Sequence, residues 1–157
     1  MPSTLQTLQT PIIKDWIDYN NHLNDAYYLV IFTKATDALQ NYLGLTLQHI
    51  QNTGETLFTV ETHLVYAQQV GLAETVTVTA QLLETDNKRL RIFQRMFNAN
   101  NELLASVEML FICYNLEAKR VTNFSPLMLQ SLAKLEADHA QIPWPTSAGK
   151  GITLKRA

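Results

Sequence analysis

Cysteine is nearly absent from this sequence of 157 residues, in which Cys113 is the single example. One cysteine excludes an internal disulfide and a metal site built on several thiolates. Cys113 lies inside the apolar run EMLFICYN, so we interpret it as a buried small hydrophobic side chain and not as a catalytic thiol. Histidines are also few, and none has the spacing of a metal-binding pair. They are His22, His49, His63 and His139. The sequence therefore offers no metal site.

A strong excess of charge is missing as well. Twelve Lys and Arg against fourteen Asp and Glu give a net charge of −2 and a pI near 6.0, which argues against nucleic acid or an anionic membrane as a partner. The longest apolar stretch, residues 26–32, is far shorter than the ~18–20 residues of a membrane span. The N-terminal MPSTLQTLQTP has neither the charged nor the apolar region of a secretory signal. We expect a cytoplasmic protein that binds no membrane.

What is present fits one folded domain with a long helix near its start. Hydrophobic residues make up 46% and charged residues 17%, typical of a globular chain. Asn24 is a good N-cap, Asp25 suits the positive end of the helix dipole, and Gly44 can end the helix. Apolar residues recur between them at intervals of three and four. They are Tyr28, Phe32, Ala35, Leu39 and Tyr42. Residues 26–32 are apolar all round, which predicts burial on most sides.

The rest of the sequence predicts an antiparallel sheet followed by a second helix. After a first strand in TLQTPIIKDW and the helix, four further strands are expected in LFTVETHLVY, ETVTVTAQLLE, RLRIFQRMF and ELLASVEMLFICY. The first two alternate between apolar and polar residues, and the last is apolar on both faces, so both of its faces must be covered. In the first of these four, Phe58 is expected on the face opposite to Glu61 and His63. SPLMLQSLAKLEAD then reads as a helix. We expect an α+β fold with one sheet wrapped around one central helix, a single domain over residues 1–138 and an irregular tail over 139–157.

The chemistry gathers at the entrance to the predicted long helix, in DWIDYNNHLNDAYY. Asp18 lies near Trp16 and Tyr19, and a carboxylate in an aromatic pocket is expected to have a raised pKa and can act as a general base. The first turn near Asn24 and Asp25 presents free backbone N–H groups that can polarise a carbonyl. Such a pair can hydrolyse an activated acyl bond. A capping or solvated aspartate remains the alternative on these residues alone.

A resemblance to a known family favours the chemical interpretation. The pattern Asp-x-x-x-His-x-Asn-x-Ala-x-Tyr, from Asp18 to Tyr28, resembles the signature of hotdog-fold acyl-CoA thioesterases of the 4-hydroxybenzoyl-CoA thioesterase type. The segments DWIDYNNHLNDAYY, ATDALQNYLGL, TVETHLVY and KRLRIFQRMF are similar to betainyl-CoA thioesterases of carnitine catabolism and to the thioesterase-like parts of carnitine dehydrogenases. The resemblance covers roughly residues 10–115 and implies a hotdog fold and hydrolysis of an acyl-CoA, with betainyl-CoA as the leading substrate.

The resemblance also implies roles for single residues. The family's catalytic carboxylate falls on Asp18, as a nucleophile or as a base for water, and the polarising N–H falls near Asp25. Asn24 and His22 belong to the same motif, although His22 can equally serve to fix the turn. Hotdog proteins form homodimers or homotetramers with sites at the subunit interface, and Glu61 and His63 are candidates for the second chain's contribution. Both can also be ordinary strand residues that face solvent or another subunit.

Substrate binding is implied by two further sets of residues. A betainyl trimethylammonium group needs aromatic faces, and the candidates are Trp16, Tyr19, Tyr27 and Tyr66, with Tyr28 and Trp144 as further aromatic residues. The phosphates of CoA need cations. Lys88, Arg89 and Arg91, with Arg95 nearby, form a basic cluster that can serve, or can be a solvated hairpin face. No metal or redox cofactor is needed, and CoA is part of the substrate.

The sequence departs from the family pattern at three places. Asn21 replaces a glycine, VGLAET replaces Leu-Gly-Asp with Glu74 as a substitute, and a histidine is expected near Gln94. These departures bear on the substrate more than on the fold. The alternatives are a thioesterase for another short or aromatic acyl-CoA, a hotdog dehydratase, an acyl-CoA-binding protein without activity, and a structural partner of a carnitine dehydrogenase.

Overall fold

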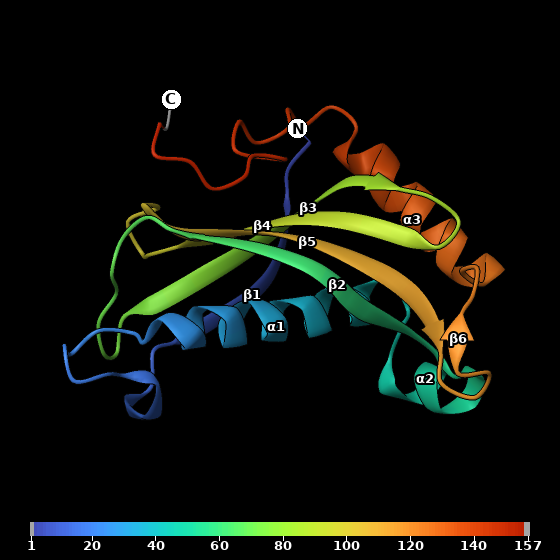
Figure 1. The fold of residues 1–157 in the computed structure, drawn as a ribbon, viewed down its shortest axis with the longest axis horizontal. Coiled ribbons are helices and arrows are strands. Elements are labelled where there is room, and N and C mark those ends of the chain that lie inside the picture. Colours follow the sequence, from blue (N-terminus) through green and yellow to red (C-terminus); the bar gives the residue numbers. More distant parts are fainter. Residues whose placement is uncertain (1, 156–157) are drawn as a thin grey trace.

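A computed structural model describes residues 2–155 and confirms the α+β architecture. The elements are β1 (Leu5–Pro11), the 3-10 turn η1 (Lys14–Trp16), α1 (Asp25–Tyr42), α2 (Leu47–Thr53), β2 (Glu55–Tyr66), β3 (Thr75–Thr85), β4 (Arg89–Phe97), β5 (Leu103–Asn115), β6 (Arg120–Val121) and α3 (Pro126–His139). The antiparallel strands lie in the order β1-β3-β4-β5-β2, with β6 added to β5. The sheet arches over α1, and α3 lies on its outer side (Figure 1).

The long helix forms where the sequence predicts it. The Asn24 side chain caps it by accepting from the Ala26 N–H at 3.0 Å, and Gly44 follows its end with a φ of +93°. Its buried face packs into the core beneath the sheet. The expectation that residues 26–32 are buried on most sides is wrong for the single chain, because Leu29 and Val30 are each 37% exposed.

The sheet sends alternate side chains to the core and to an outer face. Val76, Val78 and Ala80 of β3 belong to the core, as do the alternate residues of β4 and β5. The regular alternation expected for β2 is wrong, because the pairing with β5 shifts between Thr59 and Glu61. The extra residue of this bulge reverses the side on which residues lie. Phe58 therefore points to the outer face, together with Glu61 and His63.

The first strand has other bounds than predicted, and two short helices, η1 and α2, were not predicted. Strand β1 begins earlier than expected and ends at Pro11, an edge position that a proline tolerates, and the following residues form η1. The polar connection after α1 contains α2, which Thr46 caps by accepting from the His49 N–H at 3.1 Å and which Gly54 ends with a φ of +73°. None of the helices among residues 2–155 is long and apolar enough to span a membrane.

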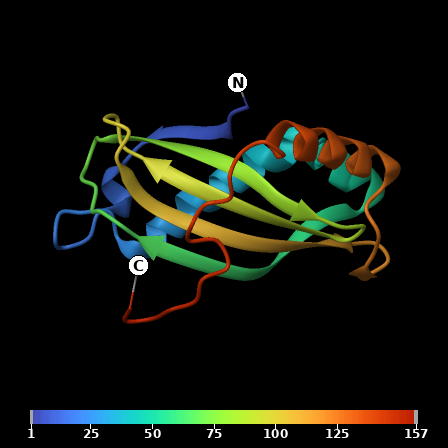
Figure 2. The ribbon, with the colours of Figure 1, turned by 90° about the horizontal axis from the view of Figure 1, so that it is seen from above.

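Buried polar contacts hold α3 against the sheet. The Ser125 N–H and hydroxyl donate to Glu55 at 2.6 and 2.8 Å, and His49 Nε2 lies 2.8 Å from the same carboxylate. At the other end of α3, the Leu82 N–H of β3 donates to His139 Nδ1 at 2.9 Å. The chain after α3 then runs across the outer face of the sheet (Figure 2), so that this face is covered by the chain's own C-terminal part.

Candidate active site

Asp18 lies at the tip of a tight hairpin that leads into α1. The hairpin is closed by a bridge between Ile17 and Leu23 and by hydrogen bonds from the Asp18 N–H to the His22 carbonyl and from the Asn21 N–H to the Asp18 carbonyl, each of 3.0 Å. Asn21 adopts a left-handed φ of 62°, a conformation that asparagine tolerates better than most residues other than glycine. The turn follows from local sequence, since Asp and Asn both favour it.

The Asp18 carboxylate has a fixed orientation and one free oxygen. Its Oδ1 accepts from the Asn20 N–H at 2.8 Å, a side-chain bond that fixes the turn. Its other oxygen has no hydrogen-bond partner among residues 2–155, and the side chain is half-buried. The main chain of His22 takes part in the hairpin and forms a bridge with Gly71, contacts that do not depend on its side chain.

The start of α1 offers a free backbone donor, the Asp25 N–H, beside this hairpin. The Ala26 N–H is used by the side chains of Asn24 and Asp25, and the Tyr27 N–H donates to the Asn24 carbonyl at 2.9 Å. The Asp25 N–H has no partner within the described chain. The Asn24 N–H donates to the Trp16 carbonyl at 2.9 Å, which ties the helix start to the base of the hairpin that carries Asp18.

Two tyrosine hydroxyls connect the start of α1 to the end of β2 by hydrogen bonds. The Tyr28 hydroxyl of α1 donates to the Gln68 carbonyl at 2.9 Å, and the Tyr66 hydroxyl of β2 donates to the Asp25 carbonyl at 3.1 Å. Their rings meet edge to face at 5.1 Å between centroids. Burial raises the pKa of Tyr28 and of Tyr66, so both phenols stay protonated donors at neutral pH. Sequence reasoning missed Gln68, which acts through its backbone and carries no sequence signal.

The predicted aromatic residues divide into those at the site and those away from it. Trp16 is 9% exposed and stacks with Tyr27 at 6.2 Å, beside the start of α1. Tyr66 lies at the same helix start, where its hydroxyl donates to the Asp25 carbonyl. Tyr19 is 94% exposed and stacks with no other ring among residues 2–155. Trp144 lies on the outer side of the sheet against Arg91, at 5.1 Å from the ring centre, and is remote from the helix start.

The predicted second-chain residues lie on the other side of the sheet from Asp18. Glu61 pairs with Leu110 and His63 with Glu108 in the register of β2 and β5, so both side chains point to the outer face. They line an open hollow of about 710 Å³ together with Arg89. Within one chain the sheet therefore separates these residues from the helix entrance.

Two of the three predicted CoA-binding cations, Arg89 and Arg91, already have carboxylate partners. Arg91 bonds to Glu108 at 2.6 Å and to Glu84 at 3.0 Å. Arg89 bonds to Asp86 at 2.6 Å and holds the pKa of that carboxyl below its usual range. The neighbouring Lys88 is exposed and has no ion-pair partner among residues 2–155. To bind a phosphate of CoA, each arginine would have to bond to it while also bonded to its carboxylate partner.

Two residues at which the sequence departs from the family pattern, Glu74 and Gln94, have well-defined contacts in the structure. Glu74 closes a turn by accepting from the Gly71 N–H at 2.5 Å, and the Leu23 N–H donates to the carbonyl of neighbouring Val70 at 2.8 Å. The segment around Glu74 thus supports the hairpin of Asp18. Gln94 is fully buried and donates to the Thr36 hydroxyl at 2.9 Å, far inside the core. Among the described residues no cluster of three or more His, Cys, Asp or Glu is arranged to hold a metal ion.

Comparison with known proteins gives consistent matches over most of the chain. The family model of the thioesterase-like superfamily matches residues 13–132. The chain is 36% identical to the betainyl-CoA thioesterase of Pseudomonas aeruginosa over 98% of both proteins. It is 31% identical, over 98% of its length, to the L-carnitine dehydrogenase/betainyl-CoA thioesterase of a Rhizobium species, of which the match covers 31%. The Staphylococcus aureus protein SAV2348, solved in complex with CoA, superimposes with a TM-score of 0.90 at 27% identity, over 97% of each chain.

Proposed function

Because the chain belongs to the thioesterase-like superfamily and has its hotdog fold, we propose that it hydrolyses betainyl-CoA to betaine and free CoA. The reaction is the hydrolysis of a thioester. The similarity to betainyl-CoA thioesterase extends over 98% of both chains, which supports the same substrate here. The observation that carries the chemistry is the Asp18 hairpin, tied directly to a helix start with a free Asp25 N–H.

In the proposed reaction the thioester carbonyl oxygen accepts from the Asp25 N–H, and the helix dipole stabilises the negative charge that develops on that oxygen. The free carboxylate oxygen of Asp18 either takes a proton from a water that attacks the carbonyl carbon, or attacks that carbon itself to form a mixed anhydride, which water then hydrolyses to the free acid and the Asp18 carboxylate. The C–S bond breaks, the CoA thiolate gains a proton, and water supplies the oxygen of the acid. Asn24 and the main chain of His22 hold the two groups in place. Only water is needed beside the substrate, so we propose no cofactor.

The acyl group is proposed to lie against the aromatic side chains at the helix start. Trp16 and Tyr27 form a stacked pair there, and Tyr66 closes the side toward β2. A trimethylammonium group is attracted by such ring faces and needs no hydrogen-bond donor. Another short or aromatic acyl-CoA is the alternative substrate. The paired Arg89 and Arg91 leave Lys88 as the readier contact for a phosphate of CoA.

We propose that the enzyme is a homodimer joined through β2. This strand is twelve residues long, lies at the edge of the sheet and exposes Phe58 by 44%, Val60 by 57% and Tyr66 by 48%. A long, apolar, unpaired edge is a template for a second strand. Because α3 and the tail cover the outer face, packing of sheet on sheet into a tetramer is disfavoured. We expect this dimer to act in the cytoplasm.

The test is thiol release from betainyl-, acetyl-, hexanoyl- and benzoyl-CoA by the wild type and by Asp18→Asn. The variant removes the charge and almost no volume, so we expect it to fold normally and to lose turnover by about 10²-fold or more. Asp15→Asn is the matched control, since Asp15 is exposed in the same segment and should leave turnover unchanged.

Each outcome assigns the function. Selective hydrolysis of betainyl-CoA that is lost in Asp18→Asn establishes the substrate and the residue together. Hydrolysis of a different ester keeps the enzyme and replaces the substrate. Near-native turnover in Asp18→Asn overturns the assignment of that residue. Binding of acyl-CoA with no turnover of any substrate indicates an acyl-CoA-binding protein.

A further inference from the structure

The residue whose backbone N–H is free at the start of α1 also carries a carboxylate. The Asp25 side chain is exposed, and its Oδ1 accepts from the Ala26 N–H at 3.0 Å. Its second oxygen has no hydrogen-bond partner among residues 2–155, and the carboxylate forms no ion pair with them. A negative charge therefore lies beside the N–H to which we assign the carbonyl oxygen of the substrate.

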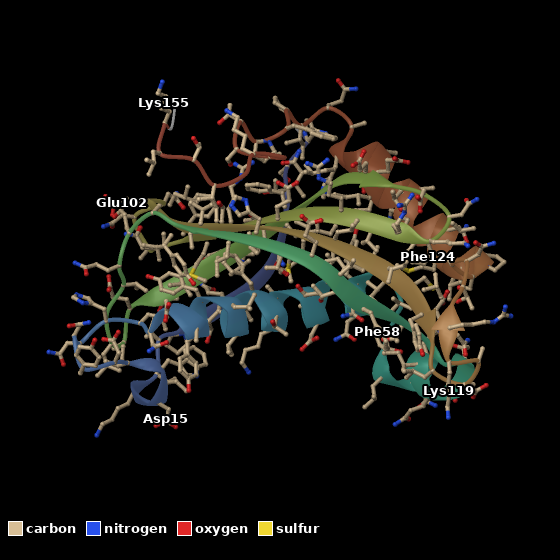
Figure 3. All side chains as sticks on the ribbon, viewed as in Figure 1. Asp15, Phe58, Glu102, Lys119, Phe124 and Lys155 are labelled. Atoms are coloured by element: carbon tan, nitrogen blue, oxygen red, sulfur yellow. The ribbon has the colours of Figure 1, made fainter. Side chains whose placement is uncertain are left out.

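The neighbouring charges do not neutralise this carboxylate. Asp18 adds a second carboxylate from the hairpin, and Glu74 adds a third from the loop that bonds to the same hairpin. Asp15 lies at this end of the molecule too, whereas α2 and β6 lie at the other end (Figure 3). Lys14 is the only lysine or arginine in residues 11–28. The helix start is therefore an acidic end of the protein.

The Asp25 carboxylate lies near Tyr66. Burial, and after it the negative charge of Asp25, raises the pKa of Tyr66, and the Tyr66 hydroxyl donates to the Asp25 carbonyl at 3.1 Å. We place the acyl group on this side of the helix start, between Tyr66 and the stacked rings of Trp16 and Tyr27. The carboxylate and the acyl group then share one side of the helix start.

The covalent structure of a betainyl group brings its ammonium close to this carboxylate. The nitrogen is joined to the carbonyl carbon through a single CH₂ group, so it lies no more than about 4 Å from the carbonyl oxygen. That oxygen lies about 3 Å from the Asp25 nitrogen when it accepts the N–H. The trimethylammonium and the Asp25 carboxylate are then within about one Debye length of each other, so that salt screens their attraction only in part.

The Asp25 carboxylate affects cationic and neutral acyl groups in opposite ways. Negative charge develops on the carbonyl oxygen in the reaction, and a carboxylate beside that oxygen opposes it. A neutral acyl group leaves this repulsion in place. A cationic acyl group offsets the repulsion, because its ammonium attracts both the carboxylate and the developing oxyanion. An acidic residue at this position therefore favours only substrates that carry a positive charge next to the carbonyl.

We propose that the Asp25 carboxylate makes the enzyme selective for a cationic acyl group. This inference rests on the reaction and the binding side proposed above, and it assigns to the side chain of Asp25 a role separate from that of its N–H. The aromatic rings supply the shape of the acyl site and a cation–π attraction. Asp25 supplies the net charge that distinguishes a trimethylammonium group from a neutral group of the same size.

Two substrates of the same shape test the proposal. In tert-butylacetyl-CoA a carbon atom replaces the ammonium nitrogen of betainyl-CoA, so the ratio of the two kcat/KM values reports the charge of the acyl group, while effects on the CoA part cancel. Asp25→Asn keeps the shape of the side chain and an acceptor for the Ala26 N–H. It should lower the ratio of betainyl-CoA to tert-butylacetyl-CoA by about tenfold, with betainyl-CoA hydrolysed more slowly and the neutral thioester faster.

Two matched variants and one measurement on the wild type complete the test. Asp25→Glu keeps the charge and should retain most of the preference. Asp37→Asn removes the same charge from an exposed position of α1, about 18 Å further along the helix, and should leave the ratio unchanged. Raising the ionic strength from about 0.01 M to about 1 M should lower the ratio of the wild type, because salt screens the attraction.

The outcomes separate this inference from the proposed function. If the wild type prefers betainyl-CoA and Asp25→Asn keeps the same preference, the role of the carboxylate is overturned and the proposed function stands. An equal loss on both thioesters shows that the Asp25 side chain only supports the helix start, and it also overturns the inference. A wild type that hydrolyses neither thioester overturns the proposed function, and the inference with it.

Discussion

Tyr66 and Tyr28 make the same kind of hydrogen bond in opposite directions across the start of α1. The residue motif places Tyr28 in the helix, yet its hydroxyl reaches the chain after β2, and Tyr66 reaches back to the first residue of the helix. The Asp25 carbonyl that Tyr66 holds belongs to the same residue as the free N–H. We therefore propose that Tyr66 positions the Asp25 N–H, which polarises the carbonyl in the proposed reaction.

Tyr66→Phe should lower kcat by about threefold to tenfold and leave KM nearly unchanged, because it removes one hydrogen bond and keeps the ring. Steady-state kinetics on betainyl-CoA measures this split. Tyr42→Phe is the control, since Tyr42 is half exposed at the far end of α1. If Tyr66→Phe instead raised KM with kcat intact, its hydroxyl would contact substrate and not position the helix.

At the scale of elements, the attachment of α3 depends on histidine being neutral. The His139 ring is buried and accepts from the Leu82 N–H with Nδ1, a role that protonation would end. Burial lowers the pKa of His139, and nearby Asp138 only partly opposes this effect. Leu82 lies where the pairing of β3 with β4 is interrupted, so the histidine accepts from an N–H at an irregular point of the ladder.

The free energy of unfolding should therefore fall as the pH drops below about 6.5, the ordinary pKa of histidine. The unfolded chain binds this proton at a higher pH than the folded chain, so the contribution of His139 is complete above that pH and is lost toward the lowered pKa. Urea unfolding at pH 7.5 and pH 5.5 measures the loss. His139→Gln should show a smaller loss, and an equal loss in both proteins would show that His139 is not its cause.

At the scale of the whole molecule, the two edges of the sheet differ. Strand β1 forms one edge and is short, with seven residues, whereas β2 forms the other edge, has twelve residues and carries exposed apolar side chains. The helix α1 adds Leu29 and Val30 to the apolar surface of the chain. The long β2 edge is therefore the surface through which we expect two chains to form one continuous sheet.

Val60→Lys should convert the dimer into a folded monomer, because it places a charge from each chain at the shared edge. Val60 is 57% exposed in the single chain, so the lysine costs little within one subunit. Sedimentation velocity gives the mass and circular dichroism the fold, with Val60→Thr as the control. A Val60→Lys protein that remains dimeric would place the subunit contact elsewhere.

The sequence by itself determined the features that depend on neighbouring residues. Asn24 and Gly44 mark the ends of α1 because capping and left-handed turns are local interactions. The alternation in β3 is equally local, and it predicted that Val76, Val78 and Ala80 share one face, which is buried. The motif from Asp18 to Tyr28 identified the family, since its residues occupy one hairpin and one helical turn.

Only the tertiary structure decided what depends on residues far apart in the sequence. The bulge at β2 exists because its pairing with β5 shifts by one residue, and this shift moved Phe58 to the face of Glu61 and His63. The sheet then separates that face from Asp18, and Arg91 finds Glu84 and Glu108 on neighbouring strands. The path of the tail and the two tyrosine hydrogen bonds arise in the same way. They join segments by packing and backbone groups, which no local sequence pattern encodes.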